Sequence, residues 1–145
     1  MFKDAGGSAK DYETVDFGYN VHGTGVHPDS YTTDKGLQNI FKMTSTCHDK
    51  NYNTTFACSI ESDKYPFMGV QFHPEKQIYE WYDDVGLNHE WESIQMNRYF
   101  ADTFVKQTRE QSNVAGDFSK VQGMIIENFD FFVTDLSQGN VYMFN

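Results

Sequence analysis

Two residues in one short segment have the types and spacing of a general base and the acid that orients it. His73 and Glu75 are separated by Pro74 and follow the apolar run Phe67–Phe72. Proline favours an extended backbone at the residue before it, and in an extended triplet the first and third side chains share a face. Glu75 is therefore expected to accept the Nδ1 proton of His73, leaving Nε2 free to deprotonate a nucleophile. A surface His–Glu pair after a strand is the alternative explanation of this tripeptide alone.

A nucleophile for this base is harder to find. The sequence has two cysteines, Cys47 and Cys58. A reactive cysteine needs an electropositive, partly exposed setting such as a helix N-terminus. Cys58 falls in the middle of an expected strand, and Cys47 lies beside His48, whose side chain should point to the opposite strand face. Structural thiols, or a cross-strand disulfide in an oxidising compartment, are the expected outcome.

A metal site is not expected. His22, His27, Cys47 and His48 are residue types that bind zinc, but their spacing does not match a zinc motif. The aromatic residues near Tyr79 and Trp81 could line a cleft, although loop packing is the default explanation for such residues.

Composition limits the classes of protein and partner. The 145 residues carry a formal net charge of -10, with 39% hydrophobic and 17% aromatic residues, which indicates one globular domain with its own core. Without a basic face, neither nucleic acid nor an anionic membrane is an expected partner. The sequence contains no apolar run of about 18 residues, and residues 1–8 lack a signal-peptide core. Asn53-Thr54-Thr55 fits the N-glycosylation pattern.

Patterning predicts the elements that must position His73. We expect Asp34 to cap a short helix, and a hairpin to centre on residues 50–53. An apolar strand buried on both faces should lead into His73, followed by a long loop. The expected ranges are a helix at 35–39, strands at 40–46, 54–60 and 67–72, a loop at 77–91, a helix at 93–109, and strands at 124–129 and 140–144 around a turn at 138–139.

The segment from Tyr65 to Trp81 resembles the gamma-glutamyl hydrolases of the class I glutamine amidotransferase superfamily. Their pattern is YPxxGVQxHPEKxxxEW, and its Glu-Trp extension distinguishes them from ordinary glutaminase domains. Asn20-Val21-His22 is similar to the family loop that borders the substrate cleft, and residues 142–145 are similar to its terminal strand. The residues that match the pattern are Tyr65, Pro66, Gly69, Val70, Gln71, His73, Pro74, Glu75, Lys76, Glu80 and Trp81.

The resemblance implies an α/β fold: the C-terminal half of a flavodoxin-like class I glutamine amidotransferase domain. Residues 1–145 would form this part of a single domain, with a mixed sheet, a β-hairpin and one main helix near residues 92–110. The family's nucleophilic cysteine, in a Gly-x-Cys-x-Gly elbow, and its oxyanion-hole amides belong to the N-terminal half, which has no counterpart in this sequence.

The implied function is a Cys-His-Glu omega-peptidase that cleaves folyl poly-gamma-glutamates without a metal or cofactor. His73 and Glu75 would be catalytic, and His22 and Lys76 would bind substrate, with Lys64 as a further basic candidate. The chain alone should be inactive. The resemblance implies a lysosomal, vacuolar or extracellular location and leaves a homodimer open. The alternatives are a non-catalytic truncated paralogue acting as a binding module, or a glutaminase domain.

Overall fold

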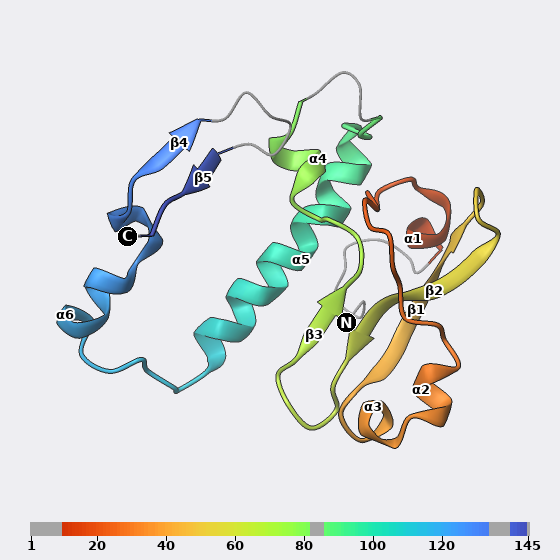
Figure 1. Ribbon diagram of the computed structural model, residues 1–145, viewed down its shortest axis with the longest axis horizontal. Helices are drawn as coiled ribbons and strands as arrows, with labels where there is room; N and C mark the ends of the chain where they lie inside the picture. The colour runs from red at the N-terminus through yellow and green to blue at the C-terminus, as the bar shows by residue number, and fades with distance from the viewer. Residues whose placement is uncertain (1–9, 82–85, 134–139, 145) are drawn as a thin grey trace. The chain divides into compact units, whose positions relative to one another are not determined.

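A computed structural model describes residues 10–81, 86–133 and 140–144, in two compact units, Met1–Glu110 and Gln111–Asn145 (Figure 1). The first unit carries the site predicted from the sequence. Its elements are α1 (Asp11–Thr14), α2 (Ser30–Thr33), α3 (Lys35–Ile40), β1 (Lys42–Asp49), β2 (Thr54–Glu61), β3 (Met68–Val70), α4 (Lys76–Tyr79) and α5 (Trp91–Glu110). The second unit holds α6 (Phe118–Val121), 3-10 turns at Gln122–Met124 and Ile126–Asn128, β4 (Phe131–Val133) and β5 (Asn140–Tyr142).

The predicted hairpin is confirmed as β1 and β2, which pair antiparallel. The Asp49 carboxylate closes the turn by accepting hydrogen bonds from the backbone N–H groups of Asn51 and Tyr52, at 2.8 and 3.3 Å. Asn53 completes the turn with φ of 49°, a left-handed conformation that asparagine tolerates better than most residues. The α/β class is confirmed, and among the described residues every strand pairing is antiparallel.

The strand leading into His73 is shorter than predicted. We expected residues 67–72 to be buried on both faces, but β3 covers Met68–Val70 and its residues are half-buried. Among the described residues β3 pairs with β2 alone and forms an edge of the three-stranded sheet, so its apolar residues are covered incompletely. Phe72, beyond the strand, is 4% exposed and enters the core.

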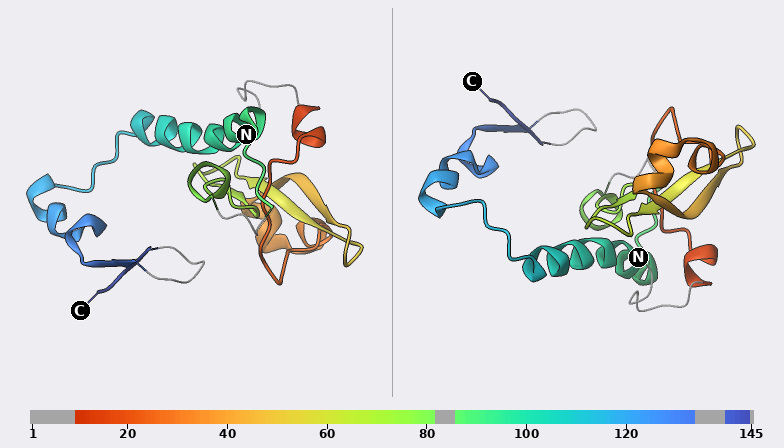
Figure 2. Two further views of the ribbon diagram at one scale, coloured as in Figure 1. Left: turned by 90° about the horizontal axis from the view of Figure 1, so that it is seen from above. Right: turned by 90° about the horizontal axis from the view of Figure 1, so that it is seen from below.

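The main helix predicted for residues 93–109 is confirmed as α5. Its buried residues, Ser93, Met96, Asn97 and Phe100, recur at the three- and four-residue spacing of one helix face. Both views in Figure 2 show α5 running alongside α4. The predicted Asp34 cap is also present, because its carboxylate accepts from the Gly36 and Leu37 N–H groups at the start of α3.

A row of aromatic rings forms the core behind the site. Phe72 contacts Phe17 on one side and Phe100 on the other, each edge to face with ring centroids 5.2 Å apart. Tyr12 extends the row by packing 5.3 Å from Phe17. Because such pairs have a preferred geometry as well as a buried area, this row fixes where the chain emerges at His73.

Two predicted segments differ in the structure. The loop expected at 77–91 begins later than predicted, because α4 covers Lys76–Tyr79, supported by an ion pair one turn apart between Lys76 and Glu80. The described residues 80–81 and 86–90 form no helix or strand, as predicted. Residues 124–129 were expected to be a strand. They form two 3-10 turns instead, in which the Asn128 N–H bonds the Ile125 carbonyl. Among the described residues of this unit the strands are β4 and β5, and the predicted turn at 138–139 lies outside the described residues.

In the described part of the chain, the structure has no helix both long enough and apolar enough to cross a bilayer.

Cys47 and Cys58 form a disulfide that joins β1 to β2, which confirms the cross-strand alternative. Cys58 is 5% exposed and packs with Phe72 and Phe100, and half-buried Cys47 packs against this cluster. The covalent link therefore secures the hairpin to the core behind His73.

The disulfide should contribute measurably to stability. It closes a segment with a sequence separation of 11, for which loop-closure entropy gives about 3 kcal/mol. Reductant should therefore lower the free energy of unfolding of the wild-type chain, measured by urea denaturation. It should leave the double variant Cys47→Ser/Cys58→Ser unchanged. Equal denaturation midpoints for the wild type with and without reductant would contradict this role.

Tyr12 should make stability fall at alkaline pH. Burial, followed by the charges of Tyr99 and Asp11, raises the pKa of Tyr12 from its ordinary 10.0 to about 12. The folded chain therefore holds this proton more tightly than the unfolded chain. Its contribution is complete below pH 10 and is lost as pH rises toward 12. In urea denaturation across this range, Tyr12→Phe should lose less stability than the wild type, and parallel curves would exclude this contribution.

Candidate functional site

The hydrogen bond expected between His73 and Glu75 is present. Nδ1 of His73 lies 2.9 Å from Oε1 of Glu75, with side chains 40% and 56% exposed. A carboxylate can only accept, so Nδ1 of the neutral ring carries the proton and Nε2 offers its lone pair. This is the tautomer required of a base that acts through Nε2.

The backbone reason for this contact differs from the sequence prediction. The extended triplet expected from Pro74 is absent, because Glu75 has helical dihedrals of −78° and −28° and stands at the N-cap of α4. The chain thus turns immediately after His73 and brings the carboxylate back to its ring. The pair therefore lies in the turn between β3, which ends at Val70, and α4, which begins at Lys76.

His73 is also anchored through its backbone. Its N–H donates to the carbonyl of Tyr19 at 2.8 Å, in an isolated antiparallel bridge. Tyr19 is the residue before Asn20-Val21-His22, so this bridge places the start of the predicted substrate loop beside His73.

His22 is held within its own loop. Its Nδ1 lies 2.8 Å from the Thr24 carbonyl oxygen and its Nε2 lies 3.1 Å from Oδ1 of Asn20. Asn20 in turn donates to the Gly18 carbonyl at 3.2 Å. The His22 ring packs edge-on against Phe56 with centroids 5.1 Å apart. The side chain is exposed but already oriented.

Lys76 has an internal partner that the sequence analysis missed. Its Nζ lies 2.6 Å from Oε1 of Glu80, and these side chains are 20% and 29% exposed. An anionic ligand would have to compete with Glu80 for this ammonium group. The i,i+4 spacing of the two residues was the available signal, but it has meaning only once α4 is recognised as helical.

Sequence reasoning also missed three buried polar residues behind the pair. Gln77 on α4 is 2% exposed, and Ser93 and Asn97 on α5 are 0% and 1% exposed. Gln77 also accepts, through its backbone carbonyl, a hydrogen bond from His89 at 2.9 Å, and the His89 ring stacks on Trp81 at 3.9 Å. The signal available was weak: polar residues at positions 93 and 97 share a helix face with Met96 and Phe100.

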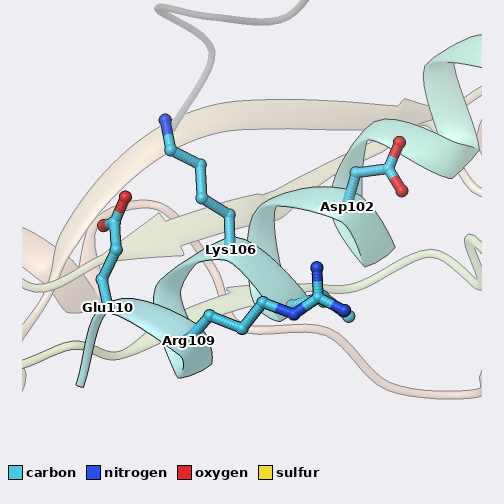
Figure 3. Close-up of a pocket in the computed structure, with 5 residues that line it drawn as sticks. Asp102, Lys106, Arg109 and Glu110 are labelled. Carbon is cyan, nitrogen blue, oxygen red and sulfur yellow. The ribbon is translucent and has the colours of Figure 1, made fainter. Parts of the chain in front are cut away.

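Two hollows of this unit lie away from the pair. Figure 3 shows side chains of Asp102, Lys106, Arg109 and Glu110 around a hollow of about 480 Å³. All of its lining residues belong to α5, so it is the space between side chains of one helix. A second hollow, of about 500 Å³, lies between α1 and α5. His73 and Glu75 line neither of them.

Comparison with known proteins supplies the context for the pair. Residues 9–85 match the family described as Glutamine amidotransferase class-I. The chain is 30% identical over 130 residues to Gamma-glutamyl hydrolase B of Dictyostelium discoideum, which covers 87% of this chain and 37% of that relative. It is 32% identical over 108 residues to Gamma-glutamyl hydrolase 2 of Arabidopsis thaliana, covering 74% of this chain and 30% of the relative. The chain thus spans about a third of the length of these curated relatives.

Removal of Glu75 should change the tautomer of His73. In Glu75→Ala the Nδ1 proton loses its acceptor, so the neutral ring should shift toward the Nε2-protonated form that free histidine favours. Ring ¹⁵N chemical shifts measure this directly. Glu13→Ala, which removes another exposed carboxylate of the same unit, is the control. An identical tautomer ratio in Glu75→Ala and the wild type would show that the contact does not orient the ring in solution.

Proposed function

We propose, because the chain belongs to the class I glutamine amidotransferase family, that His73 and Glu75 serve as the general base and its orienting acid in the hydrolysis of gamma-glutamyl amide bonds. The 2.9 Å hydrogen bond between them carries the proposal. Relatives named gamma-glutamyl hydrolase support this choice of scissile bond over a glutaminase reaction. A fold alone would not specify the chemistry.

The first half of the reaction makes an acyl-enzyme. Nε2 of His73 takes the proton of a cysteine thiol, and the thiolate attacks the gamma-carbonyl carbon to form a C–S bond. The imidazolium then donates its Nε2 proton to the leaving amine as the C–N bond breaks. Glu75 remains ionised, holds the ring and stabilises its positive charge.

The second half returns the thiol. Nε2 of His73 takes a proton from water, and the resulting hydroxide attacks the thioester carbonyl. The C–S bond breaks, the product acid is released, and the thiolate recovers its proton from the imidazolium. One water is consumed and one amide bond is cleaved.

The sulfur for this reaction must come from outside these 145 residues. The sequence has two cysteines, and they are bonded to each other. A disulfide sulfur carries no proton for His73 to remove. We propose that the thiol and oxyanion donors belong to a polypeptide region corresponding to the remainder of the relatives, and that residues 1–145 supply the C-terminal part of that domain.

The proposed substrates are folyl poly-gamma-glutamates, with His22 and Lys76 as contacts. A chain with a formal charge of -10 repels polyanions at long range, so attraction must come from groups at the site. Lys76 would contribute by exchanging its Glu80 partner for a substrate carboxylate. Exposed His22 would contribute from a ring already fixed by Thr24 and Asn20.

The proposed location is the lysosome, the vacuole or the exterior of the cell. The Cys47–Cys58 disulfide supports this, because disulfides persist in oxidising compartments and are rare in the cytosol.

One observation favours a second function, that of a non-catalytic binding module. The disulfide leaves this chain without a free thiol, and a truncated paralogue released from catalysis needs none. Such a module would keep the exposed loop around His22 as a ligand contact while losing the requirement for His73.

The isolated chain should release no glutamate from a gamma-linked diglutamyl substrate, because it lacks the attacking sulfur. Adding a polypeptide with the Gly-x-Cys-x-Gly part of a relative should restore release, measured by a coupled glutamate assay. His73→Ala should abolish the restored activity, whereas Gln95→Met, an exposed change on α5, should preserve it. Release by the isolated chain that persists in His73→Ala would refute the proposed role of the imidazole.

A further inference from the structure

Two buried side-chain amides converge on one backbone oxygen behind the His–Glu pair. Nε2 of Gln77 lies 2.7 Å from the carbonyl oxygen of Phe17, and Nδ2 of Asn97 lies 2.8 Å from the same atom. We call this arrangement of Gln77, Asn97 and the Phe17 carbonyl the amide clamp. A carbonyl oxygen has two lone pairs, so the two amides use its full capacity.

The catalytic candidates lie between two backbone attachments, and the amide clamp supplies one of them. At one end, the His73 N–H bonds the carbonyl of Tyr19. At the other end, four residues later, the Gln77 amide bonds the carbonyl of Phe17, two residues before Tyr19. The turn containing Glu75 lies between these attachments. Both ends of segment 73–77 are therefore fixed to the same short backbone segment, which limits how far the ring and carboxylate can separate.

Asn97 extends the constraint to the long helix. Its Nδ2 bonds the Phe17 carbonyl and also the Ser93 carbonyl on its own helix, at 2.9 Å. The position of α5 is thus coupled to the backbone that holds His73. The Phe72–Phe100 ring contact makes a second, apolar link between the same two regions.

Stability explains only part of why amides occupy these positions. In the described residues, Gln77 Oε1, Asn97 Oδ1 and Ser93 Oγ are buried without a hydrogen-bond partner. An unpaired buried polar group costs about 1–3 kcal/mol, which offsets part of what the two hydrogen bonds to the Phe17 carbonyl contribute. Costly polar groups in a core are expected where function requires them.

We propose that Gln77 and Asn97 are positioning residues that keep the Nδ1–H of His73 directed at Glu75. This rests on the proposed function only in assigning catalysis to that pair. The positioning itself follows from the two tethers. If the role were purely structural, loss of the amides would alter stability without altering the tautomer ratio of the His73 ring.

The tautomer of His73 distinguishes these roles. In Gln77→Met, ring ¹⁵N shifts should move toward the Nε2-protonated form, and in Gln77→Met/Asn97→Leu they should move further. Thermal unfolding, recorded in parallel, shows that each variant is folded, and the double variant should unfold at a lower temperature than the wild type because the Phe17 carbonyl loses both donors. Gln77→Glu keeps the side-chain length, and burial beside the Phe17 carbonyl favours the protonated carboxyl, which can still donate, so this conservative variant should keep the wild-type tautomer ratio. The control, Gln95→Met, makes the same chemical change on the exposed face of α5 and should change neither property.

A wild-type tautomer ratio in folded Gln77→Met would overturn the proposal. This single variant retains the Asn97 bond to Phe17, so it remains decisive if the double variant fails to fold. The measurement needs no turnover. A tautomer shift without any restored hydrolysis would count against the proposed function alone. In a reconstituted active enzyme, Gln77→Met should lower kcat and leave KM unchanged.

Discussion

The backbone from Phe17 to Tyr19 is the physical constraint on which the site depends. Its carbonyl oxygens accept from the Gln77 and Asn97 amides and from the His73 N–H, and the Phe17 ring contacts the core through Phe72. One short segment thus connects α4, α5 and the end of the sheet. Backbone carbonyls are well suited to this task because they do not titrate and have few conformations available once their segment is fixed.

The first unit contains the His73–Glu75 pair but no free thiol for it to act on. His73 has its carboxylate partner, its tautomer and its backbone anchor within these residues, whereas both cysteine sulfurs lie in a disulfide. Family membership concerns a fold and a motif, and the relatives extend well beyond the part matched here. If His73 acts as the proposed base, its nucleophile must come from another component of a larger catalytic assembly.

Local sequence signals correctly predicted the features that arise from contacts between nearby residues. The Asp34 cap, the hairpin, α5 and the His73–Glu75 contact each depend on residues close in sequence. The backbone reason given for the contact was wrong, because Pro74 leads into a helix start and not an extended triplet. The hydrogen bond from Gln77 to the Phe17 carbonyl spans 60 residues, and the residues around Gln77 contain no signal that predicts it. The length of β3 depends on neighbouring strands, so an apolar run could not fix it. The catalytic roles of His73, Glu75, His22 and Lys76 remain predictions.

The Cys47–Cys58 disulfide between β1 and β2 also determines how this chain reacts with an electrophile. With its sulfurs mutually oxidised, the polypeptide offers no thiolate for iodoacetamide or a warhead inhibitor to capture. In a mixture with a complementing polypeptide, covalent labelling would therefore mark the other component alone. Mass spectrometry of such a mixture would show the mass of the label on the polypeptide that supplies the reactive cysteine and not on this chain.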